Sequence, residues 1–173
     1  MFSAGSADSA VNLKSLLFGP HPRRTAIRAT VLIIASVVVF GFALLPVRLS
    51  GISMEPTYTD GEMNFANRLA YAAGRRPARG DVVAIRMAGM SVLYVKRIIG
   101  LPGERVEITM GTVLIDDQPL LEPTVVRKAP WNVPAVTLGD DEYFVIGDNR
   151  AMSAQNHDFG RASIDRIIGK MLF

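Results

Sequence analysis

The sequence contains no cysteine among its 173 residues. The chain therefore has no disulfide scaffold, no thiol nucleophile and no thiolate ligand for a metal. Because exported proteins can fold without disulfides, this absence does not decide the compartment. Histidine is also scarce, with His21 and His157 as the two examples, so chemistry based on histidine has few residues to draw on.

Acidic residues are rare in the first 48 residues, which hold five basic side chains and one acid, Asp8. The remainder holds 14 basic and 15 acidic side chains and is close to neutral. A nucleic-acid-binding domain would carry its basic excess on the folded part of the chain, so this distribution argues against nucleic acid as a partner. A hydrophobic fraction of 49% excludes a disordered chain, and the length allows one domain plus an anchor.

Charge is missing altogether from the 19 residues Ala29–Val47, ATVLIIASVVVFGFALLPV. A helix of about 20 apolar residues crosses the roughly 30 Å core of a bilayer. Pro46 lies at the far end of the run, where breaking a helix costs least. A buried core helix would rarely be apolar on all sides over this length. A cleavable signal peptide would need small residues after the run, which reads LLPVRLSG, so we predict a retained transmembrane anchor over residues 25–48.

The basic residues lie mainly before this span. Only Arg48 follows it closely, whereas four precede it: Lys14, Arg23, Arg24 and Arg28. The positive-inside rule then predicts a cytoplasmic tail over residues 1–24, and an extracytoplasmic domain over residues 49–173. The chain is expected to be a single-pass protein of the inner or plasma membrane.

The segment after the span has the pattern of strands joined by short turns. Two β-branched runs, Asp81–Met87 and Ser91–Ile99, predict one hairpin. Val106–Thr109 and Thr112–Asp116 flank a Met-Gly turn and predict a second. Glu142–Ile146 is an aromatic and β-branched strand. No stretch after residue 50 has a helical period, so the sequence predicts a mostly-β domain.

Two residues in this domain could form a nucleophile and a base. Ser53 stands in GISMEPT, directly after the predicted span, and Lys96 stands in the strand YVKRII. Side chains alternate along a strand, so Tyr94, Lys96 and Ile98 share one face. A lysine among apolar neighbours loses hydration and can act as a base, because burial lowers its pKa. Each observation alone is weak, since loop serines and strand lysines are common.

Four motifs in order behind one anchor make the pattern specific. They are GxSMEPT, then RGDVV at Arg79–Val83, then YVKRIIGLPGE, then GDNRxxS at Gly147–Ser153. Together they resemble the type I signal peptidase family over roughly residues 25–173. The resemblance implies an antiparallel β-sheet catalytic core, outside the membrane, that removes signal peptides from exported preproteins. It also implies cleavage after small residues at the first and third positions, nearness to membrane lipid and to the export machinery, and no cofactor.

Site residues follow from the resemblance by position. Ser53 is the expected nucleophile, Lys96 the general base, and Ser153 the hydroxyl that orients the lysine amine. The remaining positions are the nucleophile loop, Gly51, Met54 and Pro56, and a structural ion pair, Arg97 and Asp148.

The chain departs from the family pattern in three places. Some members have a serine that helps to bind the oxyanion where this chain has Gly51. Gln155 and His157 replace an aspartate and an arginine, so a second ion pair is missing. The stretch between Gly111 and Glu142 is short, which predicts a minimal accessory region.

Other interpretations remain open at this point. His157 and Asp158 could form a base and its orienting acid, and Asp148 with these two could suggest a metal site, although no ligand spacing is recognisable. A specialised relative could process a pilin or a conjugation protein with the same Ser-Lys pair. A catalytically silent, membrane-bound binding module is the alternative from another class. Self-cleaving repressors with Ser-Lys chemistry are soluble and carry a DNA-binding region, which this chain lacks.

Overall fold

The computed structural model describes residues 21–86 and 93–172. The chain divides into two units, Met1–Gly41 and Phe42–Phe173. Of the tail predicted for residues 1–24, residues 1–20 lie outside the described residues. The turn of the first predicted hairpin also lies outside them.

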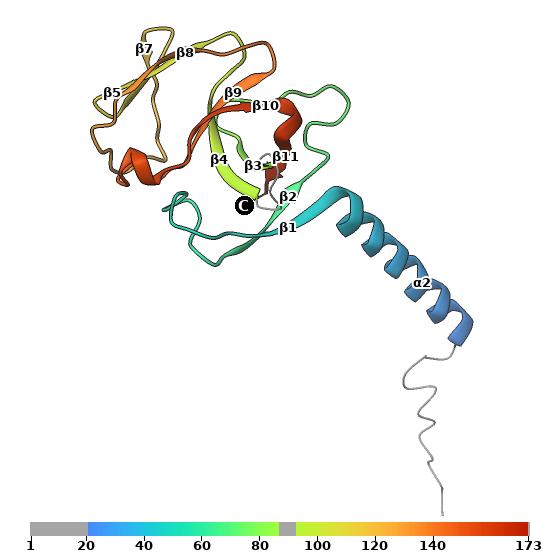
Figure 1. Ribbon diagram of the computed structural model, residues 1–173. Coiled ribbons are helices and arrows are strands. Elements are labelled where there is room, and N and C mark those ends of the chain that lie inside the picture. The colour runs from blue at the N-terminus through green and yellow to red at the C-terminus, as the bar shows by residue number, and fades with distance from the viewer. Residues whose placement is uncertain (1–20, 87–92, 173) are drawn as a thin grey trace, which may run out of the picture. The chain divides into compact units, whose positions relative to one another are not determined.

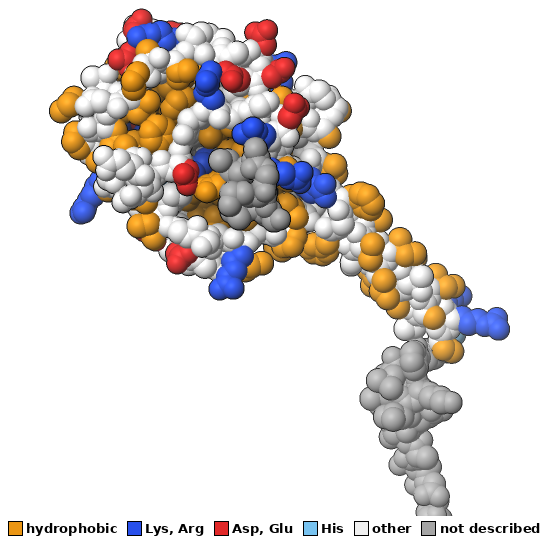
Figure 2. Space-filling view, in the orientation of Figure 1, with side chains coloured by type: hydrophobic (Ala, Val, Ile, Leu, Met, Phe, Trp, Pro, Cys, Tyr) orange, Lys and Arg blue, Asp and Glu red, His pale blue; other side chains and the backbone are white. Residues whose placement is uncertain are grey.

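The first unit contains the α-helix α2, Pro22–Val38, which begins with a proline at a position where proline is favourable. It continues as a π-helical turn, η1, Val39–Ala43. Large apolar side chains are exposed along it, and Figure 2 shows hydrophobic groups over most of its length. Within Pro22–Ala43, a window of 18 residues has a mean hydropathy of 2.2, and none of that window is buried. This helix is compatible with a single-pass membrane anchor.

The helix ends earlier than the apolar run predicts. Residues 44–48, which the predicted anchor 25–48 includes, form strand β1, Leu44–Arg48. This strand pairs with β2, Met63–Asn67, and the side chain of its own Val47 is buried. Pro46 is tolerated because β1 lies at the edge of its sheet, where a missing N–H breaks no ladder.

The second unit is built from two antiparallel sheets (Figure 1). The larger has the strand order β1-β2-β11-β3-β4-β9-β10, and the smaller has the order β7-β6-β5-β8. Beyond β1 and β2, the strands are β3 (Val82–Arg86), β4 (Leu93–Gly100), β5 (Arg105–Thr109), β6 (Thr112–Ile115), β7 (Gln118–Pro119), β8 (Val133–Thr137), β9 (Glu142–Ile146), β10 (Gly160–Ser163) and β11 (Ile167–Met171). Two 3-10 turns, η2 (Ala154–Asn156) and η3 (Ile164–Arg166), are the helical elements described in this unit.

The predicted strands are confirmed. β3 and β4 pair antiparallel, and so do β5 and β6. Met110 and Gly111 both have positive φ, at 49° and 78°, as a tight two-residue hairpin turn requires. The antiparallel, mostly-β fold class with one N-terminal apolar helix is therefore correct.

Strand β4 lies where the hydrophobic core divides into three clusters. Val95 belongs to a cluster with β1 and β2, Ile98 to one with β3 and β9, and Ile99 to one with the smaller sheet. Lys96 lies between these positions and is 4% exposed. The strand thus holds one cationic side chain inside an apolar framework, and that side chain defines the candidate site.

Candidate active site

Ser53 stands in a turn that its neighbours hold in place. Gly51 has a φ of 94°, a conformation that favours glycine, and its N–H donates to Asp60 Oδ1 at 2.8 Å. Met54 is 3% exposed and anchors the turn in the core, while its carbonyl accepts from the Tyr58 N–H at 3.1 Å. Pro56 is exposed beside it. The side chain of Ser53 is half-buried, so its hydroxyl remains accessible.

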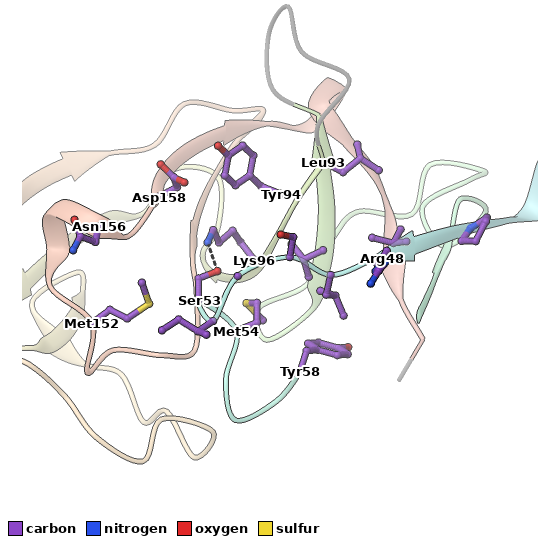
Figure 3. Close-up of a pocket in the computed structure, with 17 residues that line it drawn as sticks. Arg48, Ser53, Met54, Tyr58, Leu93, Tyr94, Lys96, Met152, Asn156 and Asp158 are labelled. Atoms are coloured by element: carbon purple, nitrogen blue, oxygen red, sulfur yellow. Dashed lines mark hydrogen bonds between the residues drawn. The ribbon is translucent and has the colours of Figure 1, made fainter. Parts of the chain in front are cut away.

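The structure brings Ser53 and Lys96 together although they are 43 residues apart. Lys96 Nζ hydrogen-bonds Ser53 Oγ at 2.8 Å (Figure 3). This distance is within the range that direct proton transfer between a base and a nucleophile needs. The pairing predicted from sequence thus has the required geometry.

Burial is the main influence on the ionisation of Lys96. It lowers the pKa of the amine, because an ammonium loses hydration in an apolar site. The Asp158 carboxylate acts in the opposite sense and raises the pKa by attraction. The Tyr94 ring adds a weak cation–π contact, with its centroid 5.9 Å from Nζ. Because burial is the larger effect, the pKa of Lys96 is lower than that of an exposed lysine, and its amine loses the proton more readily.

The Gly-Asp-Asn-Arg turn, which follows β9, holds the nucleophile loop in place through hydrogen bonds. The Asn149 N–H donates to the Ser53 carbonyl at 3.0 Å, and its side-chain amide donates to the Ile52 carbonyl at 3.0 Å. A Cβ on Gly147 would lie 2.2 Å from the Ser53 carbonyl oxygen. Glycine is therefore required at position 147 for this close approach.

The predicted ion pair between Arg97 and Asp148 is present in the structure. The guanidinium contacts both carboxylate oxygens, at 2.8 Å and 2.6 Å, and also donates to the Gly80 carbonyl at 2.7 Å. The Thr57 hydroxyl donates to the same carboxylate. Because Asp148 is 2% exposed, these partners satisfy a buried charge and join β4 to the turn.

His157 supports the same turn. Its ring is 4% exposed, and Nε2 accepts a hydrogen bond from the Gly147 N–H at 2.8 Å. Burial, and then the charges of Lys96 and Arg150, lower the pKa of His157 to about 4. The nitrogen that would take a proton is thus already an acceptor for the backbone, which favours a structural role over that of a base.

Glu122, which lies in no sequence motif, forms a buried ion pair with the arginine of the Gly-Asp-Asn-Arg turn. Arg150 pairs with Glu122, and both side chains are at most 4% exposed. Arg150 Nε also donates to the Gly147 carbonyl at 2.9 Å. The pair links the segment before β8 to the turn, where the family's second ion pair is missing. A glutamate between two apolar residues and a proline, LLEPT, was the available signal.

Ser153 is the residue whose hydroxyl is expected to orient the lysine amine. It is exposed and precedes the 3-10 turn η2. No hydrogen bond joins its hydroxyl to Lys96 within residues 21–86 and 93–172. The predicted contact that would orient the amine is absent from this structure.

Ser53 and Lys96 open onto a groove of about 580 Å³ (Figure 3). Its walls come from the segment Pro46–Met54, from Leu93–Lys96 and from the residues after the Gly-Asp-Asn-Arg turn. Among the described residues, no group of three or more His, Cys, Asp or Glu side chains could hold a metal ion. The arrangement places a serine hydroxyl, hydrogen-bonded to a buried lysine amine, in the wall of a groove.

Comparison with known proteins identifies the family of the chain. Residues 23–173 match the family model described as signal peptidase, peptidase S26. The chain is 33% identical to a probable signal peptidase I-1 from Synechocystis over 76% of its length and 71% of the relative. It is 33% identical to signal peptidase I T of Bacillus subtilis over 82% of its length and 78% of the relative.

Signal peptidase IB of Staphylococcus aureus is 32% identical over 79% of this chain and 80% of the relative. A crystal structure of a signal peptidase I from Enterococcus faecalis has 27% identity and a TM-score of 0.45, and covers 56% of this chain and 97% of that one. The family match over 23–173 and these relatives show that the chain is a serine endopeptidase and belongs to the signal peptidase family, peptidase S26.

Proposed function

We propose that this chain is a membrane-bound type I signal peptidase that removes N-terminal signal peptides from exported preproteins, with Ser53 and Lys96 as its catalytic pair. The observation that carries the assignment of residues is the 2.8 Å contact between Lys96 Nζ and Ser53 Oγ at the wall of a groove. The family supplies the substrate class.

The reaction begins with the neutral amine of Lys96, which accepts the proton of the Ser53 hydroxyl. The oxygen attacks the scissile carbonyl, and an acyl-enzyme forms as the C–N bond breaks. Lys96 returns the proton to the leaving amine, and water then releases the acyl group with Lys96 again as base. No step requires a group beyond the chain and water.

The backbone N–H of Ser53 is the candidate donor for the oxyanion. It makes no hydrogen bond within the part of the chain that the structure describes. Gly51 has no hydroxyl, and its N–H is already bonded to Asp60. Preorganised backbone donors of this kind stabilise the developing negative charge without moving.

Two unpaired strand edges support the binding of an extended peptide. β4 pairs with β3 from Leu93 onward, but with β9 only from Arg97 onward. Leu93–Lys96 therefore lacks a strand partner on its second side among the described residues. β1 is an edge strand, and its end lines the same groove. A peptide strand can add to such edges through main-chain hydrogen bonds.

We also propose that the N-terminus is cytoplasmic and the catalytic unit extracytoplasmic. Basic residues are in excess before the apolar helix, whereas the chain after the helix is close to neutral. This asymmetry supports the orientation. Protease added to cells with a permeabilised outer barrier should digest residues 50–173 and spare the tail. Protection of the catalytic unit would overturn this orientation.

Cleavage of an exported precursor by the full chain in detergent or lipid vesicles tests the catalytic pair. Ser53→Ala and Lys96→Ala should each abolish processing, and the double variant should lose no more, because the pair acts as a unit. Lys96→Arg should also be inactive, since a guanidinium does not deprotonate at working pH. Ser163→Ala, on β10 outside the groove, is the matched control and should keep activity. Processing by Ser53→Ala would favour a silent binding module with a contaminating protease.

A further inference from the structure

The groove beside Ser53 has an uneven charge distribution. Its charged lining residues are Arg48, Lys96 and Asp158, so Asp158 is the one carboxylate that lines it among the described residues. Asp158 is exposed and makes no hydrogen bond or ion pair within those residues. Its negative charge is therefore available to a ligand in the groove.

Ser53 divides the groove into two halves. In Figure 3, Arg48 lies on one side of Ser53, and Met152, Asn156 and Asp158 lie on the other. A peptide cleaved at Ser53 must place the residues before the cut in one half and those after it in the other. The direction of the chain decides which half each occupies.

Chain connectivity indicates that direction. Pro46 follows the end of the apolar helix at Ala43 by three residues, at most about 10 Å of chain. A signal peptide has its own apolar helix in the bilayer, immediately before the cut. Its residues before the cut therefore fit the half lined by Pro46–Ile52, which the chain connects directly to the apolar helix. The residues after the cut then point towards Met152, Asn156 and Asp158.

We propose that Asp158 forms an anionic subsite for the first residues of the mature protein and selects cationic over acidic side chains there. This inference rests on the proposed function and adds a specificity residue to it. The same carboxylate attracts the Lys96 ammonium, which is independent support for its reach into the site.

Cations near Asp158 could oppose this selection. Asp158, Tyr94 and Lys96 also border a second cavity of about 150 Å³, which Arg161 and Arg166 line. Neither arginine lines the main groove, and Arg161 pairs with Glu142 at 3.6 Å. Within the main groove, neither of these arginines therefore competes with a substrate for the carboxylate.

The test uses the full chain and peptide substrates that differ at one position after the cut. Lys, Gln and Glu are placed in turn at the first three positions, and kcat/KM is measured at low ionic strength. The wild type should prefer Lys to Glu by roughly two- to tenfold at one of these positions, the size expected for an exposed charge pair. Asp158→Asn should reduce this ratio to about one, and high salt should do the same to the wild type.

Asp165→Asn, which removes an exposed carboxylate outside the groove, is the matched control and should keep the wild-type ratio. A wild type without preference, or a preference that survives in Asp158→Asn, would overturn the inference while leaving the proposed function intact. A preference for Glu would assign the subsite to Arg161 and Arg166 instead. If the wild type cleaves none of the peptides, although Ser53→Ala binds them as tightly as the wild type does, the proposed function is wrong. The inference about Asp158 is then wrong as well.

Discussion

Lys96 is the residue on which the proposed chemistry depends, because its amine must be neutral to accept a proton. Burial lowers its pKa, so the active fraction of enzyme grows as the pH rises through that lowered value. We predict that kcat/KM rises with pH along a single limb set by Lys96. The measurement is a pH–rate profile on one signal-peptide substrate, with Ser163→Ala as control.

Asp158→Asn offers a second prediction from the same lysine. The carboxylate stabilises the ammonium and raises the pKa of Lys96, so its removal should lower that pKa. The limb of the pH–rate profile should move towards lower pH in Asp158→Asn and stay in place in Asp165→Asn. A limb that disappears in His157→Gln would instead identify histidine as the base.

His157 gives a prediction on stability. Its pKa is about 4 in the folded chain, whereas an unfolded histidine titrates near its ordinary value of about 6.5. Between these values the unfolded chain binds more protons, so the free energy of unfolding falls as the pH drops from about 6.5 to about 4. The loss is up to about 3 kcal/mol.

Urea titrations at a series of pH values measure this effect. His157→Gln should remove the slope, because its amide oxygen can accept the Gly147 N–H without titrating. His21→Gln changes the one other histidine, which is exposed, and should keep the slope. An unchanged slope in His157→Gln would assign the pH dependence to the carboxylates.

At the scale of elements, the sequence predicts the strands that carry a strong local pattern. β3, β4, β5, β6 and β9 are rich in β-branched and aromatic residues and pair as expected. β2 was missed because MNFAN has no β-branched residue, and β1 was absorbed into the apolar run that precedes it. Pairing with distant strands, and not local propensity, places both in the sheet.

The site shows the same division. Ser53, Lys96, Arg97 and Asp148 lie in recognisable motifs, and the structure brings them together. Glu122 lies in no motif, and its role depends on a contact with Arg150, 28 residues away, that only the folded chain reveals. The predicted contact of Ser153 depends on the path of the chain after the turn, which sequence order does not determine.

The Glu122–Arg150 pair connects the segment between β7 and β8 to the turn beside the active site. We therefore expect this pair to support the site. Glu122→Gln leaves the Arg150 charge buried without its anion, which typically costs about 3–5 kcal/mol. The variant should unfold at lower urea and lose activity, since Arg150 also holds the Gly147 carbonyl. Arg76→Ala breaks an ion pair whose side chains are 59% and 64% exposed, and should cost at most about 1 kcal/mol. Equal stability of the two variants would contradict a supporting role for Glu122.

At the scale of the whole molecule, the boundary between anchor and catalytic unit lies within the apolar run, and truncation can locate it. A chain that begins at Phe42 keeps β1, whereas a chain that begins at Leu49 loses it. Val47 packs in the cluster that contains Met54 and Tyr58, beside the nucleophile turn. Losing β1 therefore removes about 1.5–3 kcal/mol of stability for each buried aliphatic side chain and exposes the edge of β2.

The chain from Phe42 should fold and cleave a soluble peptide, and the chain from Leu49 should unfold at lower temperature and be inactive. Circular dichroism and peptide cleavage, with the full chain in detergent as control, measure both properties. Equal melting temperatures would mean that residues 44–48 belong to the anchor, as the hydrophobic run alone suggests.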